Sequence, residues 1–103
     1  MSFTGNESHD IPLATAAEWT KNYRDANPGA IKAHYFGKDA IQAILDQGGC
    51  VGIRIYYALD DDGVKHLIIV GANASENDLY QGLLAERSLP CPSSCSTANP
   101  LNC

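Results

Sequence analysis

Residues 50–72 read CVGIRIYYALDDDGVKHLIIVGA, and this stretch decides the fold. The segments 50–59 and 64–72 are rich in β-branched and aromatic residues, which are the residue types that favour strands. Between them stands Asp60-Asp61-Asp62-Gly63, a run of turn-forming residues. Two strand-forming segments joined by so short a turn predict an antiparallel β-hairpin.

The register of this hairpin depends on the length of its loop. An Asp-rich type I turn that ends in a left-handed glycine predicts a three-residue loop with a bulge, in which Tyr57 lies opposite Leu67. A two-residue loop would place Ile55 opposite Ile68 instead. Residues 67–70 are apolar on both faces, so patterning does not choose between the two registers. The same feature predicts that the second strand is covered on both sides and lies in the centre of the sheet.

A first helix is predicted over residues 15–26. Thr15 and Glu18 have the spacing of a capping box, in which each side chain bonds a backbone N–H near the helix start. Asn27-Pro28-Gly29 predicts the end of this helix, because a proline disfavours helical geometry in the residue before it. The piece at 31–36 fits strand alternation and a helical turn almost equally well, and we expect it to be a short extended piece.

A second helix is predicted over residues 38–47, where Ile41, Ile44 and Leu45 form an i, i+3, i+4 apolar stripe. Gly48-Gly49 predicts its end, since glycine accepts the left-handed conformation that closes many helices.

A third helix is predicted over residues 76–87. Its start signal at Ser75 and Asp78 is weaker, and Gly82 disfavours it. The order of elements is typical of an α+β protein. We therefore expect a small antiparallel sheet built on the hairpin 50–59/64–72, packed with about three helices.

The chain has 103 residues, a length that fits one domain. Residues 1–10 are polar and acidic without apolar periodicity, so we expect a flexible arm there. Residues 11–89 are predicted to form the single α+β domain. Residues 90–103 are rich in Cys and Pro and are predicted to form an extended C-terminal tail.

Composition narrows the classes of partner. The formal net charge is −5 with only seven Lys and Arg residues, so long-range electrostatics repel nucleic acid and anionic membranes. No run of about 18 apolar residues occurs, so no membrane insertion is expected. The start MSFTGNESHD lacks the basic and apolar parts of a secretory signal, which makes the cytoplasm the default compartment. A protein exported without such a signal, or a chain numbered after processing, escapes this inference, so secretion is not excluded.

Three of the four cysteines lie in LPCPSSCSTANPLNC at the end of the chain. Cys91 and Cys95 have a gap that is common among zinc ligands, but no second compact pair accompanies them. A disulfide between these two, or from the tail to Cys50 or Cys103, needs Cα atoms within about 7 Å and an oxidising compartment. Four reduced cysteines are the remaining alternative. We take all four as candidates for a disulfide or a metal, and we predict no cofactor.

Gly52, Arg54 and Gly71 form a second candidate site, for interaction. The two glycines lie on adjacent predicted strands near the same end of the hairpin, and a strand glycine often marks the close approach of another backbone or of a ligand. Arg54 shares a face with Gly52 and could receive a carboxylate-bearing partner. Close helix packing, with Arg54 paired to an acidic side chain, is the alternative that we favour.

The segments GCVGIRIYYALDDDG, LIIVGANASENDL and AERSLPCPSSCS together resemble a family of small, uncharacterised bacterial proteins. The resemblance spans about Trp19 to Asn102. It implies no activity and carries over no functional residues. It does imply that the tail cysteines and the strand with Gly52 and Arg54 belong to one module.

We expect a non-enzymatic interaction or assembly module, either a homo-oligomer or a small subunit of a complex, whose partner is a protein and could be a second copy. This expectation rests on the absence of a catalytic constellation, on a sheet edge that could pair with another chain, and on an extended tail. The alternative is a small metal-binding or thiol redox protein that uses the C-terminal cysteines. An enzyme using Arg54, His34 or His66 comes last, because only proximity in the fold could make a site of them.

Overall fold

The computed structural model describes residues 2–103, which form two helices and five strands. The strands make two antiparallel sheets, so the predicted α+β class is confirmed. The chain divides into two compact units. The first contains the described residues up to Glu7 together with Phe36–Ser88, and the second contains Ser8–Tyr35 together with Leu89–Cys103. Among residues 2–103, no helix is both long and apolar enough to cross a membrane.

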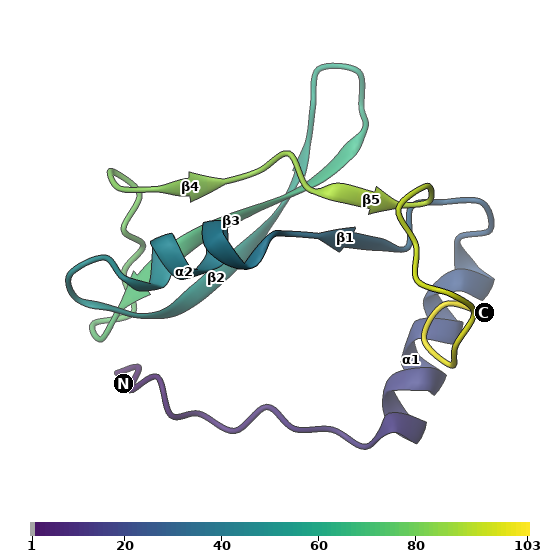
Figure 1. Ribbon diagram of the computed structural model, residues 1–103, viewed down its shortest axis with the longest axis horizontal. Coiled ribbons are helices and arrows are strands. Elements are labelled where there is room, and N and C mark those ends of the chain that lie inside the picture. Colours follow the sequence, from purple (N-terminus) through teal and green to yellow (C-terminus); the bar gives the residue numbers. More distant parts are fainter. Residues whose placement is uncertain (1) are drawn as a thin grey trace. The chain divides into compact units, whose positions relative to one another are not determined.

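The hairpin forms the sheet of the first unit (Figure 1). Its strands are β2 (Cys50–Leu59) and β3 (Lys65–Asn73), and the short β4 (Leu84–Ala85) pairs with the other side of β3. The order is β2-β3-β4, and every neighbouring pair is antiparallel. The strand that is apolar on both faces is thus the central one, as its sequence predicts.

The loop of the hairpin sets its register. Tyr57 lies opposite Leu67, which is the register of the three-residue loop. The Asp60 N–H donates to the carbonyl of Val64 (3.0 Å), and Gly63 has the left-handed φ of +81°. Glycine occupies that conformation without steric penalty, so the turn closes where the sequence places it.

Helix α2 (Lys38–Leu45) packs on this sheet. Ile44 is only 1% exposed and joins a small buried core whose other members in this unit are Ile69, Val70 and Ala72. A Cβ at Gly71 would stand 2.9 Å from Cys50 Sγ and 3.3 Å from Ile44 Cγ2. The missing side chain at Gly71 therefore lets α2 approach the central strand.

The second unit is built from segments far apart in the sequence. It contains α1 (Leu13–Ala26) and a small sheet in which β1 (Ala33–Tyr35) pairs with β5 (Leu89–Cys91). The expected extended piece at 31–36 is thus a strand. Its partner β5 begins the predicted Cys/Pro-rich tail, so backbone pairing holds the start of the tail in place.

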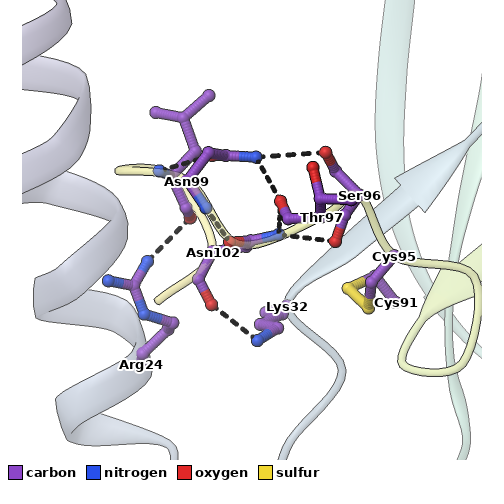
Figure 2. The surroundings of a disulfide bond; sticks show 9 residues. Arg24, Lys32, Cys91, Cys95, Ser96, Thr97, Asn99 and Asn102 are labelled. Atoms are coloured by element: carbon purple, nitrogen blue, oxygen red, sulfur yellow. Dashed lines mark hydrogen bonds between the residues drawn. A yellow bond between two sulfur atoms is a disulfide. The ribbon is translucent and has the colours of Figure 1, made fainter.

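The last three residues of the tail are held through their main-chain oxygens (Figure 2). The Arg24 guanidinium donates to the main-chain oxygen of Leu101 (2.7 Å). It also donates to the main-chain oxygen of Cys103 (3.0 Å). Lys32 Nζ donates to the oxygen of Asn102 (2.7 Å). Two cationic side chains of the second unit therefore hold the end of the tail. The acceptor atoms belong to the main chain, so these contacts do not depend on the side chains of residues 101–103.

Residues 76–87 do not form the predicted third helix. The backbone instead runs beside β3, where the Leu79 N–H donates to the carbonyl of Gly71 (2.8 Å), and it then enters β4. Glu76 and Arg87 have φ values of 68° and 62°, which a right-handed helix does not contain. Pairing with the central strand thus outweighs a weak helical pattern.

Two helix boundaries also differ from the prediction. Helix α1 begins at Leu13 rather than Thr15, directly after Pro12, and no side chain caps it, so the predicted capping box is wrong. Proline fixes φ near the helical value, and the Ala16 N–H donates to the Pro12 carbonyl (3.0 Å). Helix α2 ends at Leu45 rather than at residue 47.

The sequence-based division into an arm, a domain and a tail stays a prediction. Met1, the first residue of that arm, lies outside the described residues. Further along the arm, the Phe3 N–H donates to the carbonyl of Ala74 (2.9 Å), which connects it to the loop after β3.

Gly71 offers a direct test of the packing between α2 and the sheet. We expect Gly71→Ala to lower the free energy of unfolding by about 1–3 kcal/mol, because the new methyl group overpacks a contact that already lacks space. Gly52→Ala is the matched control, since a Cβ there meets nothing within 4 Å. Urea unfolding of both variants checks the expectation, and equal losses of stability would contradict it.

Candidate functional site

β2 is an edge strand, and the hydrogen bonds of β3 identify its outward backbone groups. Gly71 accepts from Leu79 and Asn73 donates to Asn77, so the odd-numbered residues of β3 direct their backbone groups away from β2. In an antiparallel pair, the residue opposite such a position also directs its backbone groups outward. We call the corresponding residues of β2 the edge row: Ile53, Ile55, Tyr57 and Leu59.

The edge row is apolar, exposed and without a strand partner. Tyr57 is 93% exposed and Leu59 is 69% exposed, and Ile53 and Ile55 are also exposed. Within residues 2–103, β3 is the only strand that pairs with β2, and no other segment donates backbone hydrogen bonds to the row or accepts them from it. Monomeric proteins usually protect such an edge with charged residues or proline. The edge row contains neither.

Arg54 lies on the other face of β2, in a network of polar contacts. Its guanidinium forms an ion pair with Asp78 and also donates to the carbonyl of Glu76 (3.3 Å). The Tyr56 hydroxyl donates to the second oxygen of Asp78, and the Phe3 ring centre lies 5.5 Å from the guanidinium carbon. The hydrogen bonds from Tyr56 and then Arg54 lower the pKa of Asp78, because both stabilise its charged form.

The predicted interaction residues therefore have separate roles. Gly52 is on the same face of the sheet as Arg54, and its cross-strand partner is Ala72. Gly71 is on the other face, and its cross-strand partner is Ile53. Gly71 provides space for α2, while a Cβ at Gly52 would meet nothing within 4 Å. Arg54 has an acidic partner from its own chain. The two glycines and the arginine do not form one continuous strip.

His66 lies between two carboxylates. Its Nε2 is 2.9 Å from Asp60 Oδ2, and its Nδ1 is 2.8 Å from Glu86 Oε1. The hydrogen bond to Asp60 and the negative charge of Glu86 raise the pKa of His66, because both favour the imidazolium. With both ring nitrogens occupied, His66 has none left to take a proton from a substrate. His34 belongs to β1 in the second unit.

Two of the four candidate cysteines are joined in a disulfide, and the other two are free. Cys91 and Cys95 form a disulfide, with Cα atoms 4.8 Å apart. Cys50 and Cys103 are free thiols. Cys50 is half-buried in the first unit and donates to the carbonyl of Gly52 (3.2 Å), whereas Cys103 is exposed in the second. One of the disulfides considered from the sequence is thus present.

A hollow of about 300 Å³ lies in the first unit, beside the end of α2 and the loop after β3. Its lining residues are Gln47, Gly48, Asp78, Leu79, Tyr80, Gln81 and Gly82. The only carboxylate among them, Asp78, is already bonded to Arg54 and Tyr56. Across the described chain, residues 2–103, no group of three or more His, Cys, Asp or Glu side chains is placed to hold a metal ion. The carboxylate that lines the hollow is therefore already bonded to side chains of β2.

The contacts of His66 with Asp60 and Glu86 predict that the stability of the fold depends on pH. Because folding raises the pKa of His66, its contribution is fully present below the ordinary histidine value of about 6.5 and is lost as the pH rises through the raised value. We therefore expect His66→Gln to lower the urea midpoint more at about pH 6 than at about pH 9. In a protein that already carries Glu86→Gln, the effect of His66→Gln should differ less between the two pH values, since one of the two carboxylates is absent. A loss that is equal at both pH values would refute this role.

Comparisons with family models, curated proteins and solved structures found no match to this chain. The resemblance to a family of small bacterial proteins therefore stays a prediction, and the geometry of the site carries the functional argument alone.

Proposed function

We propose that the protein is a non-enzymatic assembly module that associates with a second copy of itself through the edge row of β2. The observation that carries this proposal is the row of unpaired backbone groups, combined with uncharged side chains at the same four positions. Addition of a strand to an open sheet edge supplies main-chain hydrogen bonds, and the alternating side chains supply apolar contact.

A second copy is the occupant that this edge fits best. The row has no charge that would select an oppositely charged partner. When two copies pair antiparallel about Tyr56, Ile53 lies opposite Leu59 of the other copy and Ile55 lies opposite Tyr57. A two-fold axis then joins identical surfaces, as in most homodimers.

Charge supports the same arrangement. The turn at Asp60-Asp61-Asp62 is the most acidic stretch of a chain whose net charge is −5. Antiparallel pairing about Tyr56 places the two turns at opposite ends of the joined sheet, where salt screens their repulsion. Arg54 of one copy lies opposite Ala58 of the other, so the two arginines do not meet directly.

Self-association is preferred over catalysis because the polar clusters of the first unit are occupied by each other. Asp78 binds Arg54 and Tyr56, and His66 binds Asp60 and Glu86. A catalytic base needs a site that can receive a proton from a substrate. Neither cluster leaves one open, whereas the backbone groups of the edge row have no partner within the described chain.

Tyr57→Lys tests the proposal with little risk to folding, since the side chain is 93% exposed. We expect the purified protein to form a dimer under reducing conditions and the variant to raise the dissociation constant by about tenfold or more, because an edge lysine opposes strand pairing. Tyr80→Lys is the matched control, because Tyr80 is exposed at 70% in the same unit but lies outside the edge row. Analytical ultracentrifugation of the three proteins measures the effect.

Two results would overturn the proposal. A protein that stays monomeric at high concentration, with its cysteines reduced or oxidised, has no self-association to explain. A dimer weakened as much by Tyr80→Lys as by Tyr57→Lys would use a different surface.

A further inference from the structure

We propose that Cys95 is a site of thiol–disulfide exchange, where the Cys103 thiol of a second copy attacks and links two copies covalently. The residues concerned all lie in the second unit. The proposal therefore does not rest on the edge row of β2, and the two can be tested separately.

The two sulfurs of the disulfide differ in accessibility. Cys91 is only 4% exposed and lies in β5, where its carbonyl accepts from the Lys32 N–H (2.7 Å). Cys95 is exposed in the turn that follows, where the Ser94 N–H donates to the carbonyl of Pro90 (2.8 Å). An incoming thiolate must reach one sulfur and expel the other. Access therefore favours attack at Cys95, with Cys91 as the leaving group.

Cys103 is the exposed free thiol of the same unit. Its main-chain oxygen is held by Arg24 (3.0 Å), and its Sγ lies 3.4 Å from the carbonyl oxygen of Asn99. The only other free thiol in the described chain, Cys50, is half-buried and belongs to the first unit. Reactivity of cysteines follows exposure, so Cys103 is the better nucleophile by position.

Cys103 is bonded to an asparagine network, because its Sγ donates to the carbonyl of Asn99. The Asn99 N–H donates to Asn102 Oδ1 (2.8 Å), and the Asn102 side chain donates to the carbonyls of Ser96 (3.1 Å) and Thr97 (3.2 Å). In Figure 2 these residues lie between Arg24, which holds the main chain of Cys103, and the disulfide. Attack within one chain would break this network. Attack on a second copy leaves it intact.

The reaction balances without an added oxidant. The Cys103 thiol gives its proton to solvent, and its sulfur forms a bond to the Cys95 sulfur of the other copy. The Cys91–Cys95 bond breaks, and its electron pair leaves on the Cys91 sulfur, which takes a proton from solvent. One disulfide and one thiol are consumed, and one disulfide and one thiol are formed. A direct link between two Cys103 residues would instead require an oxidant.

The test uses the full chain with its Cys91–Cys95 disulfide intact, kept free of oxygen at mildly alkaline pH and high concentration. We expect a dithiothreitol-sensitive dimer on a non-reducing gel. Mass spectrometry of its peptides should show a Cys95–Cys103 link and a free thiol at Cys91. Cys103→Ser should reduce the linked dimer by about tenfold or more. Cys50→Ser is the matched control and should leave the amount unchanged.

A second variant separates exchange from oxidation. The double substitution Cys91→Ser/Cys95→Ser keeps the Cys103 thiol but removes the disulfide that it attacks, so no linked dimer should form. Absence of any link in the wild-type protein would overturn the proposal. So would a link between two Cys103 residues, or a Cys95–Cys103 bond within a monomer.

The outcome is distinguishable from that of self-association through β2. Tyr57→Lys should leave the covalent link in place, because the edge row contributes no atom to the exchange. If the link disappears in Tyr57→Lys while Cys103 stays reduced, exchange depends on prior pairing through β2 and the independent version of the proposal fails.

Discussion

Antiparallel pairing of β2 with β3 is the constraint on which the first unit depends. A shift of one residue in this register would exchange the two faces of β2. Gly71 would then no longer face α2, and Arg54 would no longer face the loop that carries Asp78. The left-handed Gly63 and the hydrogen bond from Asp60 to Val64 fix the loop length and so the register. A turn of four residues thereby places the core, the polar network and the open edge.

The segment after β3 shows how side-chain contacts stabilise a backbone that has little regular structure. Asp78 receives bonds from two side chains of β2, and Glu86 contacts His66 of β3. The Gln47 side chain accepts from the Leu83 N–H (2.9 Å) and donates to the carbonyl of Ile44 (2.9 Å). Each contact joins this segment to an element that is already fixed by the hairpin or by α2. The segment is therefore held by its neighbours rather than by its own helical propensity.

The sequence predicts the hairpin and its centre well because their signals are local. Strand-forming residues, the acidic turn and a segment apolar on both faces all lie within residues 50–72. Helix α2 was also predicted, since its apolar stripe is short-range information. The segment 76–87 was mistaken for a helix because its leucines suit either state, and the choice depends on backbone pairing with β3. Such pairing leaves no periodic pattern in the segment itself.

The candidate site was predictable only in part, for the same reason. Arg54 was expected to have an acidic partner, but its identity as Asp78 follows from the loop path, and the role of Glu86 follows from the end of β4. The open edge was foreseen as a property of small sheets, yet the four residues of the row become known only from the hydrogen bonds of β3.

Charged groups in both polar clusters of the first unit have partners from the same chain, whereas the outward backbone groups of the edge row have none within residues 2–103. In the second unit, Arg24 and Lys32 bind main-chain oxygens of the tail, and a free thiol is the exposed reactive group. An unpaired strand edge and an accessible thiol can each form bonds with another protein chain. The association proposed for each unit rests on a separate set of groups, which are the outward backbone groups of β2 in the first unit and the Cys103 thiol in the second.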